Sequence, residues 1–466
     1  MDFESARRPE TWLLALAGVA WFGYGAGGGL AGLVLAAIPG GLLVTGAGAT
    51  LFFPGDRLIS RTAATGALVG LLFAVLMLLF EPLAALVLGA LSAVGGLAAA
   101  RLTADDLAPP AGYEIPPLDV RLSAEIALDE AVVGSLASSM GVYSRPIQSR
   151  VGRELDETLD WLRANGWLEE PAGFHQEPPP LGPVAVGAER TAGIDYEVMR
   201  FDSEFEPRTG APGRERWMGY ANNRTAEVRV VRAPGSRDWV ICIHGLAMGR
   251  TWFDLRVMGV GWLQRRGVNI ALPVLPLHGH RGNGVMSGAG FLTGDVTNTL
   301  HALTQTAWDV RRLIGWLREE GAEHIAVTGL SLGGYSTALV ASLEDELDCA
   351  IAGIPPAEFG ELTCYHASGR ALAQAEAQNI TPERISAALR PVSPLALQPR
   401  VPKDRRFVFG ALADRFVPPA QVEMLWHHWD QPEILWYPGG HLGFRFHRGV
   451  RDFVDGALQR SVRAGR

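Results

Sequence analysis

The sequence is poor in cysteine and in lysine, and each shortage excludes a class of function. Cys242, Cys349 and Cys364 are the only cysteines among 466 residues, which is too few and too scattered for a disulfide framework or a paired-cysteine metal site. Lys403 is the only lysine, and the net charge is −8. Because a chain without a basic field does not attract a phosphate backbone, we expect no nucleic-acid partner. We also expect a reducing compartment, no metal and no other cofactor.

Charged residues are scarce as well, at 19% of the chain, and they are absent from long runs near the N-terminus. The uncharged runs are Thr11–Gly55, Thr62–Phe80 and Pro82–Ala100. A helix of about 20 residues crosses the apolar core of a bilayer. The first run is long enough for two crossings, with the glycine-rich stretch Gly23–Gly29 as the turn and Pro39 as a tolerated kink. Residues 1–104 are therefore expected to hold four membrane helices, at about 11–28, 30–53, 62–80 and 82–100.

Two alternatives apply to this segment. A turn at Pro39–Gly41 would leave a second helix too short to span, so the helix boundaries within 11–55 stay open. The runs could also be core helices of a soluble protein, but the 90 residues from Thr11 to Ala100 contain only four charged residues and so have no polar face. We prefer the membrane interpretation.

The flanking charges predict an orientation. Positive charges near membrane helices stay on the cytoplasmic side. The connections on one side of the expected spans carry arginines, and those on the other side carry no positive charge. We therefore expect a cytoplasmic N-terminus and a cytoplasmic location for the domain that follows the helices, residues 184–466, and, because no ionisable residue lies mid-span, an anchoring role for the helices. The arginines on the cytoplasmic side are Arg7, Arg8, Arg57, Arg61 and Arg101.

Composition changes after the last uncharged run. Residues 105–117 form a proline-containing linker, residues 118–170 a small helical subdomain, and residues 171–183 a proline-rich hinge. Within the subdomain, Leu155, Leu159 and Leu162 share one helical stripe. A small helical unit could bind DNA, but the lack of a basic face favours a spacer or docking role, and its function stays open.

The remaining residues, 184–466, alternate between strand and helix patterns. Trp239–Ile243 is a short continuous apolar run, as in a buried central strand, and Val296–Leu317 has apolar residues at helical spacing. Alternating units of this kind predict the α/β class, with a mostly parallel central sheet covered by helices on both faces. Ligands in such folds bind at the carboxyl ends of the strands.

One motif in this region carries chemistry. Ser331 lies in the sequence Gly329-Leu330-Ser331-Leu332-Gly333, between an expected strand that ends at Thr328 and an expected helix. This is the G-x-S-x-G turn in its strand–turn–helix context. Glycine is needed on both sides because the turn is strained and passes close to neighbouring backbone. We expect Ser331 to be a nucleophile.

With this motif, the sequence over roughly residues 184–459 resembles the α/β-hydrolase superfamily, in a branch near the alpha/beta hydrolase domain-containing proteins. The pair His244-Gly245 resembles the family's oxyanion element, Asp414 lies in a segment similar to its acid-bearing loop, and His441 in one similar to its histidine loop. The order Ser331, Asp414, His441 is the order that this fold uses.

The resemblance implies a role for each residue. His441 would take the Ser331 proton and later return one to the leaving group, while Asp414 would orient and stabilise the imidazole. The backbone N–H groups of Leu246 and Leu332 would stabilise the oxyanion.

Competing residues fit these roles less well. Asp404 precedes a strand instead of following one, and His427 and His428 lie within an expected helix. His278 and His280 lack a nearby third metal ligand, so a loop or pocket-lining role is favoured over a metal site. Residues 355–406 form an insertion that, by the resemblance, is expected to cap the active site.

The expected function is a membrane-anchored serine hydrolase that cleaves a carboxylic ester, soluble or presented as a lipid by the membrane, through an acyl-enzyme on Ser331. An acyltransferase with the same triad is an alternative, and so is a catalytically silent membrane scaffold. The sequence leaves open the acyl and alcohol specificity and the oligomeric state.

Overall fold

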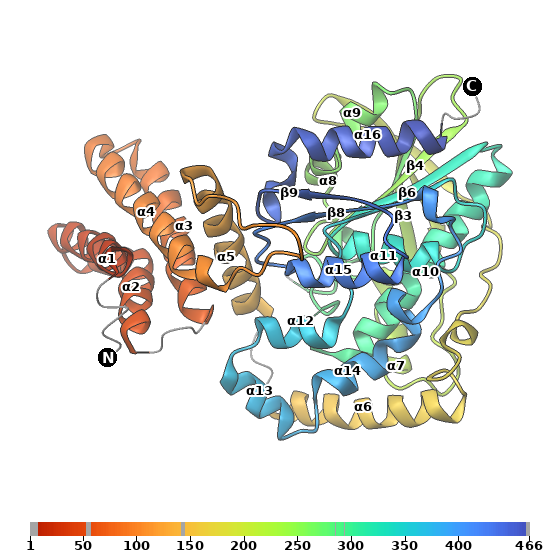
Figure 1. Cartoon of the computed structure of the whole chain (residues 1–466), viewed down its shortest axis with the longest axis horizontal. Coiled ribbons are helices and arrows are strands. Elements are labelled where there is room, and N and C mark those ends of the chain that lie inside the picture. Colours follow the sequence, from red (N-terminus) through yellow and green to blue (C-terminus); the bar gives the residue numbers. More distant parts are fainter. Residues whose placement is uncertain (1–7, 53–56, 141–144, 285, 293, 463–466) are drawn as a thin grey trace. The chain divides into compact units, whose positions relative to one another are not determined.

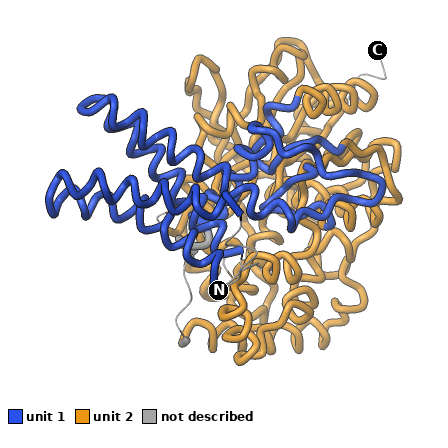
Figure 2. The backbone as a smooth tube through the Cα atoms, turned by 60° about the vertical axis from the view of Figure 1, so that its left-hand side comes forward, with its two compact units in different colours: residues 1–142, 411–420, 436–447 blue, residues 143–410, 421–435, 448–466 orange. Residues whose placement is uncertain are grey.

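The structure is a computed structural model, and it describes residues 8–52, 57–140, 145–284, 286–292 and 294–462. The chain consists of two compact units (Figure 2). Unit 1 comprises residues 1–142, 411–420 (the acid loop) and 436–447 (the histidine loop), and unit 2 comprises the rest. The loops that contain Asp414 and His441 therefore group with the N-terminal helices. Arg7 and Phe53, which belong to the expected charge pattern and the expected second helix, lie outside the described residues.

Unit 1 contains the helices of the uncharged runs. The first two are separated at Gly28, within the expected glycine-rich turn, and Gly29 adopts a φ of 65°. Pro39 lies inside the second helix, so the chain does not turn there. The helices of these runs are α1 (Pro9–Gly27), α2 (Gly29–Phe52), α3 (Arg57–Met77) and α4 (Pro82–Thr103), and the charged helix α5 (Val120–Met140) also belongs to unit 1.

Three of these helices are long and apolar enough to cross a membrane, where the sequence predicts four. Among the described residues, the candidate spans are Gly29–Phe52, Arg57–Met77 and Pro82–Asp106. Helix α1 falls short because Glu10, several glycines and the aromatic residues Trp12 and Tyr24 lower its mean hydropathy. For the residues that the structure describes, the expected count of four spans is therefore corrected to three candidate spans.

Side-chain size in α1–α4 follows the pattern of helices packed in lipid. Small residues lie between the helices: a Cβ added to Gly18 of α1 would lie 2.9 Å from the carbonyl oxygen of Gly40 in α2. Large apolar residues point outward, and Leu30, Phe80 and Leu83 are 81%, 83% and 77% exposed. Close backbone approach inside and apolar surface outside are typical of membrane helices, which gain little from burying apolar surface.

A nine-stranded sheet forms the core of the second half of the described chain, in the order β1-β2-β3-β5-β4-β6-β7-β8-β9. The pairs β5–β4, β4–β6, β6–β7 and β7–β8 are parallel, and β1–β2, β2–β3 and β3–β5 are antiparallel. The mostly parallel α/β sheet is confirmed. The strands are β1 (Ala185–Thr191), β2 (Ile194–Asp202), β3 (Thr225–Val231), β4 (Asp238–Ile243), β5 (Asn269–Pro273), β6 (His324–Leu330), β7 (Cys349–Gly353), β8 (Arg406–Ala411) and β9 (Glu433–Tyr437).

Helices cover both faces of this sheet. In Figure 1, α9 and α16 lie on one side of the strands, and α10 and α11 lie on the other. The central strands β4 and β7 are buried along their whole length, as expected for strands covered on both faces. The helices of this half are α6 (Arg145–Ala164), α7 (Arg214–Met218), α8 (Thr251–Val257), α9 (Val260–Gln264), α10 (Val296–Glu319), α11 (Leu332–Ala341), α12 (Phe359–His366), α13 (Gly369–Glu376), α14 (Pro382–Leu389), α15 (Pro419–His428) and α16 (Arg448–Val462).

The residues expected to form one helical subdomain, 118–170, divide between the two units. Helix α5 groups with unit 1, and α6 groups with unit 2. The buried face of α6 contains Leu155 and Leu162, both 0% exposed. Its leucine stripe therefore packs within unit 2.

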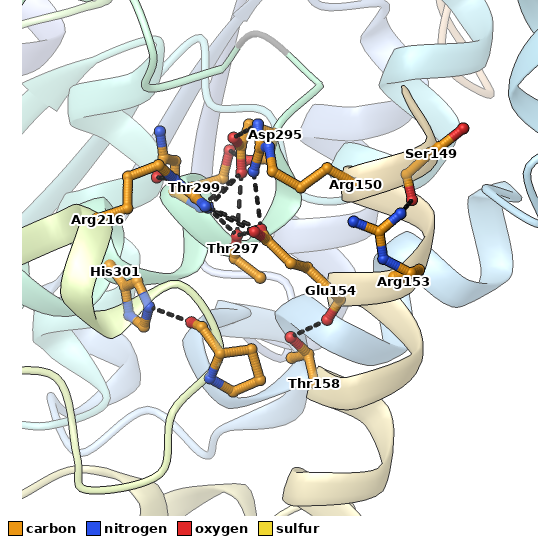
Figure 3. Close-up of polar contacts among 12 residues, drawn as sticks. Ser149, Arg150, Arg153, Glu154, Thr158, Arg216, Asp295, Thr297, Thr299 and His301 are labelled. Atoms are coloured by element: carbon orange, nitrogen blue, oxygen red, sulfur yellow. Dashed lines mark hydrogen bonds and ion pairs between the residues drawn. The ribbon is translucent and has the colours of Figure 1, made fainter. Parts of the chain in front are cut away.

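Charged groups also attach α6 to the rest of unit 2 (Figure 3). Glu154 of α6 accepts hydrogen bonds from Arg216 at 2.6 and 2.7 Å and from Thr297 at 2.8 Å. Arg150 donates to Asp295 at 2.7 Å, and Asp295 caps the N-terminus of α10. Burial opposes ionisation of Glu154, but these hydrogen bonds outweigh it and lower the pKa of Glu154 to about 2. The network joins α6 to the first turn of α10.

The proline-rich segment 171–183, expected as a hinge, lies bound along α10. Arg312 donates to the carbonyl oxygens of Pro179 at 3.0 Å and Pro180 at 2.9 Å, and Arg311 donates to the carbonyl oxygen of Gln176 at 3.0 Å. Proline lacks an N–H but keeps its carbonyl, so arginine can hold such a segment where strand pairing cannot. These contacts fix the segment within unit 2.

Candidate active site

Ser331 lies in a strained turn between β6 and α11 in unit 2. Its φ is 56° and its ψ is −118°, a conformation that residues with a side chain rarely adopt. The Ser331 N–H donates to the carbonyl oxygen of Gly353 at 2.8 Å, which helps to hold the turn. The side chain is half-buried at the carboxyl end of β6, where ligands bind in folds of this class.

The flanking glycines are required by close approach of the backbone. A Cβ on Gly329 would collide with the carbonyl group of Gly333, and a Cβ on Gly333 would collide with the carbonyl group of Ile243. The G-x-S-x-G pattern therefore has a steric cause here: the turn folds back on itself and against the end of β4.

The segment after β4 passes directly beside this turn. A Cβ added to Gly245 would lie 3.2 Å from the carbonyl oxygen of Leu330 and 3.6 Å from the Ser331 Cβ. Leu246 follows this contact in the chain. Leu332 is the first residue of α11, and N–H groups in a first helical turn have no partner within their own helix. The segment after β4, which contains Leu246, and the start of α11, which contains Leu332, thus lie beside Ser331 at the same edge of the sheet.

His244 fixes the conformation of that segment. Its Nε2 accepts a hydrogen bond from the Leu275 N–H at 3.1 Å, so its Nδ1 carries the proton and donates to the carbonyl oxygen of Gly245 at 2.8 Å. Burial lowers the pKa of His244 to about 3. The ring is therefore neutral at physiological pH and acts as a bridge between the loops after β4 and β5.

Asp414 and His441 form a hydrogen-bonded pair in unit 1. Oδ2 of Asp414 lies 2.6 Å from Nδ1 of His441, and the side chains are 1% and 5% exposed. The other oxygen, Oδ1, accepts the N–H groups of Phe416 at 2.8 Å and Val417 at 2.7 Å. These bonds orient the carboxylate toward the imidazole. The Phe416 ring stacks on the His441 ring at 4.7 Å between centroids and 19° between planes.

The environment favours protonation of this histidine. Burial opposes the charged imidazolium, but the carboxylates of Asp414 and Asp129 outweigh burial and raise the pKa of His441. A buried base that gains a proton during a reaction needs such compensation, because an isolated buried cation is costly.

The competing residues lie in other surroundings. Asp404 is exposed and precedes β8, and Nε2 of His428 lies 2.8 Å from the carbonyl oxygen of Leu397. His278 is fully buried, with its ring 5.0 Å from that of His244, whereas His280 lies near Glu227 at 3.6 Å. His278 and His280 therefore face different partners. In the part of the chain that the structure describes, no group of three or more histidine, cysteine, aspartate or glutamate side chains could hold a metal ion.

The expected cap, residues 355–406, contains the helices α12–α14. It packs against the helix that follows Ser331: the Tyr335 hydroxyl of α11 donates to the carbonyl oxygen of Val392 at 2.9 Å, and the Tyr335 and Phe359 ring centroids lie 4.6 Å apart. Cys364 of α12 is partly exposed. The insertion is therefore anchored to the helix on which the Ser331 turn rests.

Sequence reasoning did not identify two contributors to the Asp414–His441 pair. Phe416 lies two residues after Asp414, and its role as a stacking surface has no sequence signature. Asp129 of α5 contacts the histidine loop through its carboxylate. The available signal was the pair of acidic residues Glu125 and Asp129, four residues apart in an expected helix and therefore on one face.

The chain is similar in sequence to a known family and to two mycobacterial proteins. The family model "Alpha/beta hydrolase domain containing 18" matches residues 221–355. Uncharacterized protein Rv2627c of Mycobacterium tuberculosis strain H37Rv is 41% identical over 345 residues, which cover 73% of this chain and 83% of the relative. Uncharacterized protein MT2702 of strain CDC 1551 matches with the same identity and the same coverage.

Solved structures also match at low identity. An acetyl xylan esterase from Paenibacillus sp. R4 is 18% identical, with a TM-score of 0.43 and coverage of 65% of this chain and 94% of that chain. An acetyl xylan esterase from Thermoanaerobacterium is 14% identical, with a TM-score of 0.44 and coverage of 64% and 92%. The family match, the mycobacterial relatives, the parallel sheet and the Ser331 turn lead to one identification: the chain belongs to the α/β-hydrolase superfamily, in the same family as the mycobacterial proteins.

Proposed function

We propose that this protein is a membrane-anchored serine hydrolase that cleaves a carboxylic ester through an acyl-enzyme on Ser331. The observation that carries the proposal is the strained backbone of Ser331, at φ 56° and ψ −118°, in a turn whose glycines are sterically required. A structure keeps such strain mainly where function uses it. The pairing of Asp414 with His441 in a buried environment supplies the second support.

The proposed reaction has two steps. In the first, His441 accepts the Ser331 proton while Oγ attacks the ester carbonyl carbon, and the resulting imidazolium protonates the departing alcohol. In the second, His441 takes a proton from a water molecule as the water oxygen attacks the acyl carbon, and the imidazolium returns that proton to Ser331 Oγ as the acyl C–Oγ bond breaks and the carboxylic acid leaves. Asp414 stabilises the imidazolium in both steps, and the N–H groups of Leu246 and Leu332 stabilise the oxyanion.

The proposal places the catalytic part in the cytoplasm. Arg8 pairs with Asp105 at 2.8 Å and Arg57 pairs with Asp106 at 3.6 Å within unit 1. These pairs support one shared side for the start of α1, the start of α3 and the end of α4, and arginines mark the cytoplasmic side. Protease added to intact cells should leave residues 184–466 uncut, and digestion without lysis would contradict the orientation.

Ester turnover by the full-length protein in detergent tests the activity. We expect the protein to hydrolyse a p-nitrophenyl acyl ester, and Ser331→Ala to reduce kcat by about 10⁴-fold or more. Ser342→Ala is the matched control, because Ser342 follows the last residue of α11 and its hydroxyl donates back to the Ala338 carbonyl oxygen at 3.1 Å. Acyl transfer to an added alcohol in preference to water would identify an acyltransferase. No turnover and no transfer would favour the scaffold alternative.

A further inference from the structure

Helix α5 carries three buried carboxylates that the proposed reaction does not use. Glu125, Asp129 and Glu130 are 9%, 0% and 1% exposed. A buried carboxylate is costly unless hydrogen bonds or opposite charges compensate for it. The partners of these three groups therefore indicate what α5 contributes, and all of those described below lie in unit 1.

The Asp129 carboxylate contacts backbone N–H groups of both loops, the one that contains Asp414 and the one that contains His441. Its Oδ2 accepts the N–H of His441 at 2.6 Å, and its Oδ1 accepts the N–H of Leu442 at 3.1 Å. The N–H of Arg415, next to Asp414, also points to Oδ2 at 3.4 Å. One carboxylate thus holds the histidine loop at the catalytic residue itself and contacts the acid loop one residue from the catalytic acid.

The glycines of the histidine loop permit this contact. A Cβ added to Gly440 would lie 2.7 Å from Oδ2 of Asp129. The Gly440 N–H donates to Oε2 of Glu125 at 3.0 Å, and a Cβ on Gly443 would collide with the Glu125 carboxylate. The Gly-Gly-His-Leu-Gly sequence of the loop is therefore explained by the approach of α5.

Glu130 extends the connection to the membrane helices. Its Oε1 accepts from Nε of Arg415 at 2.6 Å, and its Oε2 accepts from Nε of Arg61 in α3 at 3.3 Å. The Thr65 hydroxyl of α3 also donates to the carbonyl oxygen of Ala131 at 3.3 Å. Helix α5 is thus fixed on one side to α3 and on the other to the loops of the catalytic pair.

The ionisation of Asp129 depends on the Asp414–His441 pair, and the pair in turn depends on Asp129. Burial and the neighbouring Asp414 carboxylate raise the pKa of Asp129 to about 7, while His441 and the loop N–H groups oppose the rise. In return, the Asp129 carboxylate contributes to raising the pKa of His441. The ionisable groups around this site are Glu125 and Glu130 on α5, Arg61 on α3, Asp414 and Arg415 on the acid loop, and Tyr437, His441 and His447 on or beside the histidine loop.

We propose that Asp129 is a positioning residue for His441: its carboxylate fixes the backbone of the histidine loop so that the imidazole stays aligned with Asp414. This inference rests on the proposed hydrolase function. It also changes the expected role of the N-terminal helices. Because α3 holds α5 through Glu130, these helices support the catalytic pair in addition to anchoring the chain.

Asp129→Asn in the full-length protein tests the assignment. The amide keeps the size of the side chain, but it has one acceptor oxygen and would direct N–H donors at a backbone N–H. We expect kcat for ester hydrolysis to fall by about 10- to 100-fold, as for a displaced catalytic group, and KM to stay within about twofold. The acid limb of the kcat/KM profile should move to lower pH by about half a unit, because His441 loses a neighbouring negative charge.

Asp119→Asn, at the residue that precedes the first residue of α5, is the matched control. Asp119 accepts the Leu122 N–H at 2.8 Å at the start of α5, and asparagine can also fill this capping role. The kcat and the pH profile of the Asp119→Asn protein should therefore equal those of the wild type. A folded Asp129→Asn protein with unchanged kcat and unchanged acid limb would overturn the assignment.

The same set of variants also covers two further outcomes: a variant that does not fold and a wild-type protein that is inactive. If Asp129→Asn does not fold, Asp129→Ser is assayed in its place with the same expected changes. If neither variant shows a cooperative thermal transition, Asp129 is a folding requirement and the positioning role is wrong. A wild-type protein that neither turns over ester nor reacts with a fluorophosphonate contradicts the proposed function itself, whereas an active wild type with an unaffected variant contradicts only the role of Asp129.

Discussion

Oδ2 of Asp414 lies 2.6 Å from Nδ1 of His441, with both side chains almost fully buried. The short distance and the burial make this bond strong, since a charge-assisted hydrogen bond gains strength where water is excluded. The other Asp414 oxygen is held by two backbone N–H groups, so the carboxylate cannot rotate away. The pair is thus preorganised to hold a proton on the imidazole.

Asp414→Asn should abolish most activity. The amide cannot stabilise the imidazolium, and it favours the wrong tautomer of His441, so we expect kcat to fall by about 10⁴-fold. Asp404→Asn, at an exposed site before β8, should keep wild-type kcat in the same ester assay. Loss of activity in Asp404→Asn with full activity in Asp414→Asn would reassign the catalytic acid.

The activity should depend on pH through His441. Because the buried pair raises the pKa of His441 above its usual value, and because only the neutral imidazole accepts a proton, kcat/KM should fall as the pH drops through that raised pKa. We expect the midpoint of the acid limb above about 6.5. A full pH–rate profile with a substrate that does not ionise measures it. A midpoint well below that value would show that the imidazole does not gain this stabilisation.

Gly245→Ala should damage the oxyanion site without unfolding the sheet. The added Cβ would lie 3.2 Å from the Leu330 carbonyl oxygen, and the displaced segment would move the Leu246 N–H from its proposed position. We expect kcat to fall by about 100-fold with little change in KM. Gly315→Ala on α10, where an added Cβ meets nothing within 4 Å, is the matched control. Equal activity of the two variants would remove Leu246 from the mechanism.

Glu154→Gln should weaken unit 2 in a pH-dependent way. The pKa of Glu154 is lowered to about 2, so its stabilising effect is present above its unfolded pKa and is lost as the pH falls toward 2. We expect the free energy of unfolding to drop by about 1–2 kcal/mol at pH 7, after allowance for solvent screening of a partly exposed group. The difference from wild type should shrink at pH 3.

Denaturant unfolding at both pH values, with exposed Glu157→Gln as the control, measures this effect. A constant difference at pH 7 and pH 3 would show that the Glu154 charge does not contribute.

The sequence predicts the sheet class and the Ser331 turn because both depend on local patterns. The apolar run Trp239–Ile243 is a central strand, and the glycines around Ser331 are required by contacts a few residues away or with an adjacent strand. The uncharged runs likewise predict helices whose ends lie within a few residues of the observed bounds. The count of spans differs because Glu10 and the glycines of α1 reduce its mean hydropathy.

These local sequence patterns do not predict contacts between residues that are distant in the chain. Nothing local indicates that Arg312 binds the carbonyl groups of Pro179 and Pro180, or that α5 and α6 belong to different units. The role of Asp129 depends on a residue more than 300 positions away, His441. Buried charges whose partners are distant in the sequence can be recognised only once the chain is folded.

Covalent labelling of the full-length protein tests the central claim most directly. A fluorophosphonate forms a stable adduct with an activated serine, and peptide mass spectrometry identifies the modified residue. We predict one adduct, on Ser331, that is absent from Ser331→Ala and present in Ser342→Ala. An unlabelled wild-type protein, or unchanged labelling of Ser331→Ala, would contradict the assignment of this chain as a serine hydrolase that acts through Ser331.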